Sequence, residues 1–175
     1  LYGSEAIGGV INLITKLPED VYNFSIEAFT SSWGELNVDL GTKYNIKNSQ
    51  GLIGINYFNY SNPIDNNEDG FTDLTLQHRV SIFNKINTKS NTLAFRYFYE
   101  DRWGGQMNWN SSLRGGNEVY GESIYTSRFE VFGKYDISKD IFLQYSLNNH
   151  DQNSVYGTTY YNALQTIGFI QAVYS

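Results

Sequence analysis

Apolar and polar residues alternate along most of this chain with a period of two. In the clearest run, residues 123–136, Tyr125 and Phe129 share one face, and Arg128 and Glu130 lie on the other. This alternation is typical of β-strands that have one apolar and one polar face. It predicts about eight strands of roughly 10 residues each, which cover 22–33, 35–45, 51–61, 74–86, 92–102, 123–136, 140–151 and 164–175.

The predicted connections differ in length between the two ends of the strands. Short turns rich in Asn, Ser, Lys and Asp are expected at 46–50, 87–91 and 137–139. Longer loops are expected at 62–73, 103–122 and 152–163, and the connection around Trp33 and Gly34 is a short exception. Short turns at one end and long loops at the other are typical of outer-membrane barrels. The expected fold is therefore all-β, an antiparallel transmembrane β-barrel fragment, with the polar face toward the lumen.

The composition agrees with this fold and excludes several functions. Aromatic residues make up 17% of the chain, and no apolar run approaches the length of a transmembrane helix. Aromatic residues near predicted strand ends fit the girdles of a membrane barrel; they are Trp33, Tyr44, Tyr57 and Tyr135. The chain has no Cys, which excludes disulfides and thiolate sites, and its net charge of −6 argues against nucleic-acid binding.

The first residues, Leu1–Lys16, form a different kind of segment, small and apolar with closely spaced glycines. This run resembles the last segment of the plug domain in TonB-dependent outer-membrane receptors, where the chain leaves the plug and enters the barrel. The residues that carry the resemblance are Tyr2, Gly3, Gly8, Gly9, Asn12 and Lys16. Gly8 and Gly9 permit backbone conformations that side chains would block.

The resemblance implies a domain organisation and a function. Residues 1–18 would be the C-terminal end of the plug, and 19–175 the N-terminal part of a barrel that has 22 strands in this family. The implied function is active import of a scarce nutrient, such as cobalamin, a siderophore or haem, across the outer membrane of a Gram-negative cell. The implied partners are the TonB–ExbB–ExbD complex, which would act through an N-terminal segment outside this chain, the chelate ligand and outer-membrane lipids. A surface lipoprotein is a further candidate partner.

Three shorter motifs resemble receptors of Bacteroidetes that are related to cobalamin and iron-chelate transporters. They lie at Arg102–Gly105, Tyr120–Thr126 and Tyr156–Tyr160.

Residues 65–73 have the form D-x-N-x-D-G-x-x-D, which matches the first half of a calcium loop. The candidate ligands are Asp65, Asn67, Asp69 and Asp73. Leu76 occupies the position of the bidentate Glu of an EF-hand, so an EF-hand is excluded. A partial calcium site and a solvated acidic turn remain the two interpretations.

The longest predicted loop, 103–122, holds the candidate ligand contacts Trp103, Met107, Trp109, Arg114 and Tyr120. Aromatic side chains on a loop suit a bulky chelate, and an arginine suits an anionic group. The alternative is a loop that packs over the barrel mouth or contacts a partner lipoprotein.

No catalytic constellation is expected, because His78 and His150 are the only histidines and neither has a nucleophile or metal-ligand spacing around it. The protein is therefore expected not to be an enzyme. Two alternatives to import stay open: a small structural or adhesion barrel, and a receptor-like scaffold subunit of a larger outer-membrane complex.

Overall fold

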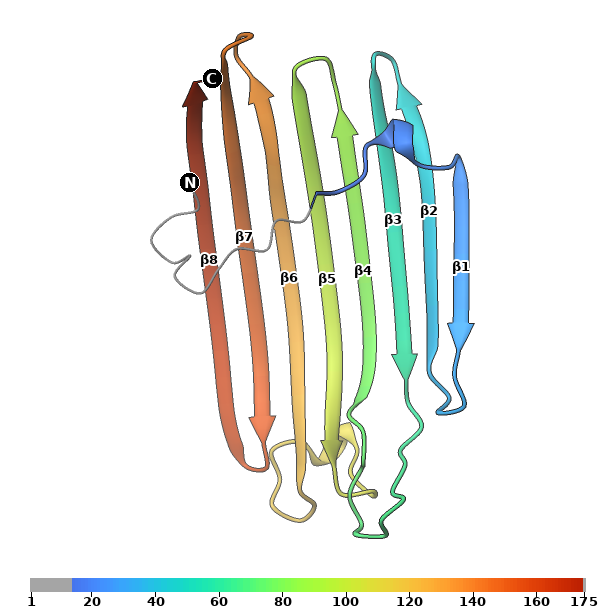
Figure 1. The fold of residues 1–175 in the computed structure, drawn as a ribbon. Coiled ribbons are helices and arrows are strands. Elements are labelled where there is room, and N and C mark those ends of the chain that lie inside the picture. The colour runs from blue at the N-terminus through green and yellow to red at the C-terminus, as the bar shows by residue number, and fades with distance from the viewer. Residues whose placement is uncertain (1–13, 175) are drawn as a thin grey trace.

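Each strand of this chain pairs with its sequence neighbours, which gives one antiparallel sheet in the order β1 to β8 (Figure 1). The computed structural model describes residues 14–174. The strands are β1 (Phe24–Thr30), β2 (Leu36–Ile46), β3 (Ser49–Tyr60), β4 (Leu76–Asn87), β5 (Asn91–Gly105), β6 (Gly121–Asp136), β7 (Ile141–Tyr156) and β8 (Thr159–Tyr174). Two short 3-10 turns, η2 (Pro18–Asp20) and η3 (Ser111–Leu113), lie outside the sheet. The predicted all-β antiparallel fold is confirmed, and the described sheet is not closed, as in a fragment of a barrel.

The connections confirm only part of the predicted asymmetry. The β2–β3, β4–β5 and β6–β7 turns are short and lie at one end of the sheet, and the connections 61–75 and 106–120 lie at the other (Figure 1). The predicted loop 152–163 is wrong, because β7 and β8 continue through it and leave only Gly157 and Thr158 as the turn. Gly157 has φ 58°, and a two-residue hairpin turn takes Gly readily at such a position. Polar composition alone suggested a loop here, although the strands are simply polar at this end.

The first predicted strand, 22–33, is too long. β1 ends at Thr30, and Trp33 lies in the turn that follows it. This turn is closed by a hydrogen bond from the amide of Gly34 to the carbonyl of Ser31, at 3.0 Å, and Gly34 has φ 82°. Trp33 is therefore not a strand residue, whereas Tyr44, Tyr57 and Tyr135 do lie in strands.

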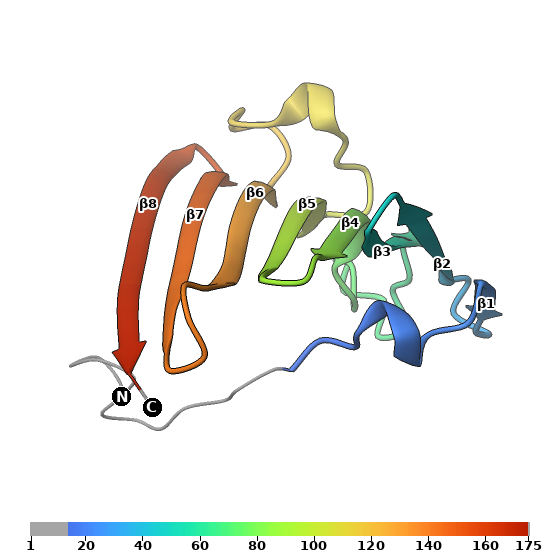
Figure 2. The ribbon, with the colours of Figure 1, turned by 90° about the horizontal axis from the view of Figure 1, so that it is seen from above.

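The sheet is curved, and residues 14–20 cross its concave side (Figure 2). We call this side the inner face and the opposite side the outer face. Because side chains alternate along a strand, register assigns every strand residue to one of the two faces. Lys85 of β4 contacts residues 14–20, so Leu52 and Ala94, its partners across the sheet, also belong to the inner face.

The outer face carries a row of exposed apolar side chains at one level of the sheet. Its members are consecutive cross-strand partners from β1 to β6: Ile26, Leu40, Ile55, Ile82, Tyr97 and Phe129. All six are exposed. A contiguous apolar surface of this width is unusual on a protein that meets only water.

Four residues further toward the long loops, the outer face becomes polar. The row at this level runs from β3 to β7 and contains Asn59, His78, Asp101, Tyr125 and Asn153. Strands β5 to β8 have 15 or 16 residues, and about 9–11 residues suffice to cross a bilayer. These strands are therefore long enough to hold both an apolar level and a polar level. The outer face thus divides into an apolar zone near the short turns and a polar zone near the loops.

Two tyrosines of the outer face cover glycines on the neighbouring strand near the short turns. Tyr44 lies over Gly51 and Tyr145 over Gly133, and both pairs are direct cross-strand partners. A tyrosine ring over a glycine fills the gap that the missing side chain leaves and helps to define the register.

Adding a methyl group at Gly133 should destabilise the protein. The new Cβ would lie 2.2 Å from the carbonyl oxygen of Thr92 and 2.6 Å from the hydroxyl of Tyr145. We expect Gly133→Ala to lower the free energy of unfolding by about 1–3 kcal/mol, as overpacking usually does. Gly168→Ala is the matched control, because nothing lies within 4 Å of its Cβ position on the same face. Urea unfolding of the full-length protein in detergent measures both; equal midpoints for the two variants would contradict this packing.

Candidate functional site

The inner face carries a connected set of charged and polar side chains in the middle of β5, β6 and β7. Arg96 donates from its terminal nitrogen to Glu130 at 2.9 Å, and its Nε lies 2.6 Å from the other carboxylate oxygen. Asn148 donates to the same Glu130 at 2.9 Å, and Arg128 donates to Nδ1 of His150 at 3.2 Å. The Glu130 side chain is only 13% exposed, so this carboxylate is held by its partners more than by water.

A second polar cluster lies on the inner face of β2 and β3. Asn56 donates to Asn37 at 3.0 Å and to Asp39 at 2.8 Å. The two clusters thus place hydrogen-bonding groups on the concave side at β2 and β3 and at β5 to β7. Such a lining suits water, a polar solute or a polar segment of protein, and does not suit lipid.

Lys85 attaches the N-terminal segment to this lining. Its ammonium group donates to the carbonyl oxygen of Thr15 at 3.2 Å, to the hydroxyl of Thr15 at 3.0 Å and to the carbonyl of Lys16 at 3.2 Å. Lys85 is only 6% exposed, and no acidic side chain among residues 14–174 forms an ion pair with it. An ammonium group in such surroundings depends on its hydrogen-bond acceptors, so Lys85 and the segment stabilise each other.

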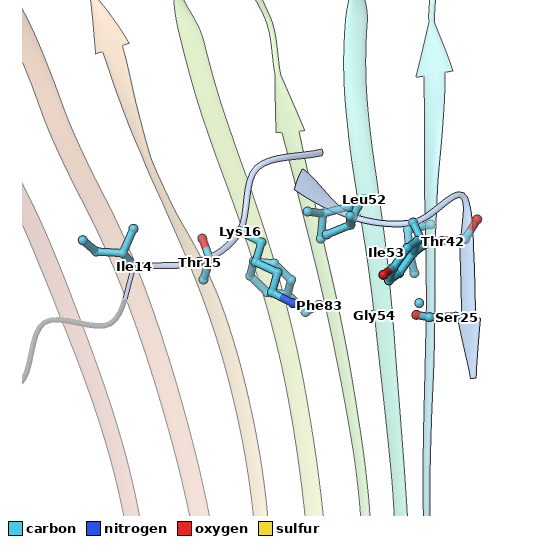
Figure 3. Close-up of a pocket in the computed structure, with 12 residues that line it drawn as sticks. Ile14, Thr15, Lys16, Ser25, Thr42, Leu52, Ile53, Gly54 and Phe83 are labelled. Carbon is cyan, nitrogen blue, oxygen red and sulfur yellow. The ribbon is translucent and has the colours of Figure 1, made fainter. Parts of the chain in front are cut away.

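Small residues leave a hollow beside this attachment. Ser25, Gly41 and Gly54 are consecutive cross-strand partners on β1 to β3, and Phe83 continues the row on β4. The N-terminal segment passes over the row and encloses a cavity of about 420 Å³ (Figure 3). Leu52 adds an apolar wall, and buried Pro18 of η2 lies close to β3 and β4. The inner face is therefore shaped to accept a chain segment at this point.

Of the residues of the predicted plug motif, Lys16 lies in this contact through its carbonyl group. The others, Tyr2, Gly3, Gly8, Gly9 and Asn12, lie outside the described residues. The boundary near residue 18 between a plug segment and a barrel segment stays a prediction.

The two long loops are joined to each other. Phe71 and Gln106 form an isolated antiparallel bridge. Around it, the amide of Thr72 donates to Gly105 at 2.8 Å and the amide of Met107 donates to Gly70 at 2.9 Å. These contacts continue antiparallel pairing past the loop end of β5, and they restrict the motion of both loops.

The predicted ligand contacts of the longest loop lie near the outer face. The loop folds back over the convex side of the sheet (Figure 2). Arg114 donates to Ser123 at 2.5 Å and to the side chain of Asn153 at 2.5 Å, and its guanidinium carbon lies 4.4 Å from the centroid of the Tyr125 ring. Because Nε and one terminal nitrogen of Arg114 donate to strand residues, Arg114 serves here to hold the loop.

The aromatic residues of the same loop pack on each other. Trp103 and Trp109 have ring centroids 4.8 Å apart, and Trp109 is 6% exposed. Tyr120 donates a 2.5 Å hydrogen bond to Glu122, and this bond is the largest cause of the raised pKa of its phenol. Met107 is exposed. The structure thus brings Trp103 and Trp109 together, places Arg114 beside Ser123, and leaves the ligand-contact role of all five residues a prediction.

The predicted calcium ligands form a closed turn. Both carboxylate oxygens of Asp65 accept backbone amides, from Asp69 at 3.1 Å and Gly70 at 2.9 Å. Asp69 accepts the amide of Phe71 at 2.8 Å, and Asn67 donates to Asp69 at 3.0 Å. Asp73 accepts from Asn66 at 2.8 Å. Across residues 14–174, no group of three or more His, Cys, Asp or Glu side chains is arranged to hold a metal.

Lys85, the residue that attaches the N-terminal segment, was not a candidate in the sequence. The one signal in the sequence was the position of this charged residue: Lys85 lies on the same face of the sheet as the apolar residues Leu52 and Ala94. Its partner Thr15 lies 70 residues away, and a local pattern does not reveal such a contact.

Comparisons of the chain with protein-family models, with curated proteins and with solved structures find no match. Within residues 14–174, no helix has the length and apolar character needed to span a membrane.

Replacing Lys85 should release the segment that it holds. We expect Lys85→Met to raise the rate of trypsin cleavage after Lys16 by roughly 10-fold or more, because a hydrogen bond to a charged group contributes about 1.5–3 kcal/mol. Lys134→Met is the matched control, since Lys134 is a lysine of the inner face that pairs with Asp136 at 2.7 Å. Cleavage is followed by mass spectrometry on the full-length protein, and an unchanged rate in Lys85→Met would show that the contact does not hold the segment.

Proposed function

We propose that this chain forms part of the wall of an outer-membrane β-barrel, and that the barrel belongs to a TonB-dependent receptor which imports a scarce nutrient. The observation that carries the proposal is the opposite character of the two faces. A row of exposed apolar side chains runs along the outer face from β1 to β6, and hydrogen-bonded polar clusters lie on the inner face at β2 and β3 and in the middle of β5 to β7. This is the inverse of a soluble domain, in which the concave side of a curved sheet would enclose an apolar core.

The placement of the zones supports a membrane position. The apolar zone lies near the short turns, and the polar zone of the outer face lies near the long loops. In an outer-membrane barrel, the turns face the periplasm and the longer loops face the outside. The strands would then cross the bilayer next to the turns, and their loop ends would project beyond it.

The segment held by Lys85 supports the assignment to a plugged receptor. It enters the concave side, runs along η2 and continues directly into β1 (Figures 1 and 2). In TonB-dependent receptors the plug lies inside the barrel and its last segment continues into the first strand, and this is the family that Leu1–Lys16 resembles. The proposed cargo is a chelate such as cobalamin, a siderophore or haem, and the proposed partner is the TonB–ExbB–ExbD complex.

Uptake by living cells tests the function. A strain that lacks the full-length gene should lose uptake of one labelled nutrient from a panel of cyanocobalamin, ferric siderophores and haem. The gene should restore uptake, and an uncoupler of the proton-motive force should abolish the restored uptake. Normal uptake of the whole panel, together with loss of another outer-membrane protein, would favour the scaffold alternative.

We also propose that the turn at Asp65–Asp73 binds calcium. Its carboxylates are concentrated in a short exposed turn, where Asp65 and Asp69 accept hydrogen bonds from the backbone amides of the turn. Calcium would take the place of these amides as the partner of the carboxylate oxygens. Calorimetric titration of the full-length protein with calcium chloride should show saturable binding at millimolar concentration or below. The double variant Asp65→Ala and Asp69→Ala should lose it, whereas Asp140→Asn, at the other end of the sheet, should keep it. No saturable heat in the unsubstituted protein would refute the site.

A further inference from the structure

A cavity of about 540 Å³ opens on the inner face at the loop end of β3. Three aromatic side chains line it: Trp33 from the β1–β2 turn, and Phe58 and Tyr60 from the end of β3. Glu35 and Asp73 add two carboxylates, from the β1–β2 turn and from the loop that follows β3. The volume of this cavity lies in the range of about 300–1,000 Å³ that is typical of small-molecule sites.

The two carboxylates are not neutralised by the described part of the chain. Neither Glu35 nor Asp73 forms an ion pair within residues 14–174. Asn66 occupies one oxygen of Asp73 with two hydrogen bonds of 2.8 Å, and the other oxygen accepts none from these residues. The guanidinium of Arg79 is not among the groups that line the cavity, but its carbon lies 4.9 Å from the centroid of the Phe58 ring, so one cationic side chain stands next to the cavity. The charged groups among the described residues that line the cavity are therefore two carboxylates.

The hydroxyl group of Tyr60 also lacks a partner. Tyr60 is 5% exposed, and its oxygen has no hydrogen-bond partner among residues 14–174. A buried hydroxyl without a partner costs about 1–3 kcal/mol. Because a tyrosine hydroxyl both donates and accepts, a bound molecule with a polar group could remove this cost.

We propose that this cavity binds a small organic cation, an ammonium or guanidinium group that carries an apolar substituent. The carboxylates of Glu35 and Asp73 supply the opposite charge. The rings of Trp33 and Phe58 supply apolar walls, and the Trp33 ring attracts a cation to its face. The hydroxyl of Tyr60 accepts a hydrogen bond from the cation. An anion would meet two carboxylates, and no cationic side chain is among the described residues that line the cavity.

The biological role of this cavity rests on the proposed function. In an importing receptor, the inner face at the loop end is where a molecule from outside first meets the lumen. The cation would then be part of the imported molecule. This differs from the sequence-based expectation of an anionic group at Arg114, which donates from Nε to Ser123 and from one terminal nitrogen to Asn153.

Three probes of similar shape and different charge test the proposal: phenethylammonium, neutral phenethyl alcohol and anionic 3-phenylpropanoate. Each is titrated into the full-length protein in detergent at low ionic strength, and binding is followed by saturation-transfer NMR. We expect phenethylammonium to bind at least 10-fold more tightly than the alcohol, and 3-phenylpropanoate not to saturate.

Variants connect the binding to the named residues. The double variant Glu35→Gln and Asp73→Asn should weaken phenethylammonium about 10-fold and leave the alcohol unchanged. Tyr60→Phe keeps the ring and should weaken the ammonium probe about 2- to 10-fold. Glu118→Gln is the control, since Glu118 lies in a loop at the same end of the sheet and does not line the cavity.

Three results would overturn the proposal: equal affinity for the cation and the anion, no effect of the double variant, or no binding of any probe. Failure of this site and failure of the import function are separable. If the deletion strain loses uptake of one nutrient, the gene restores it, and no probe binds, the cation site is refuted and import stands. If the probes bind as expected and the deletion strain takes up every nutrient normally, the cation site stands and import is refuted.

Discussion

Successive side chains of a β-strand point to opposite faces, and the rest of this structure depends on that constraint. Eight consecutive strands pair in order, and the row from Ile26 to Phe129 aligns one apolar position of each strand from β1 to β6 with an apolar position of the next. A shift of one residue in any pair would move its apolar set to the polar face. The tyrosine rings over Gly51 and Gly133 oppose such a shift near the short turns.

The polar inner face explains why the N-terminal segment can lie there. A segment of irregular backbone needs partners for its carbonyl groups, and Lys85 provides them for Thr15 and Lys16. The row of Ser25, Gly41 and Gly54 removes side-chain volume beside the segment, and the networks around Glu130 and Asp39 line the space further along. The fold thus uses its two faces for two environments, and the loop between β3 and β4 borders one end of the inner face.

The sequence predicted this architecture well where alternation is strong. β6 was expected over 123–136 and runs from Gly121 to Asp136, because its two faces differ clearly in polarity. The prediction failed for 152–163, where the outer face itself becomes polar and a strand resembles a loop. Alternation identifies a strand only while its two faces meet different environments.

The candidate sites were harder to predict, since they depend on how loops fold. A pattern within 103–122 does not show that Arg114 turns back to Asn153, which lies 39 residues further along the chain. Nor does it show that Trp33 meets Tyr60 around one cavity. These contacts arise from tertiary structure, and only their residue types were visible beforehand.

Spin-label accessibility along β7 tests the central claim most directly, namely that the outer face meets lipid and the inner face does not. Single cysteines at Leu143, Gln144, Leu147 and Asn148 of the full-length protein, reconstituted in bilayers, are labelled and exposed to oxygen and to a water-soluble nickel chelate. The account predicts that labels at Leu143 and Leu147, on the outer face, collide mainly with oxygen, and that labels at Gln144 and Asn148 do not. Equal accessibility at all four positions, or the reverse alternation, would contradict it.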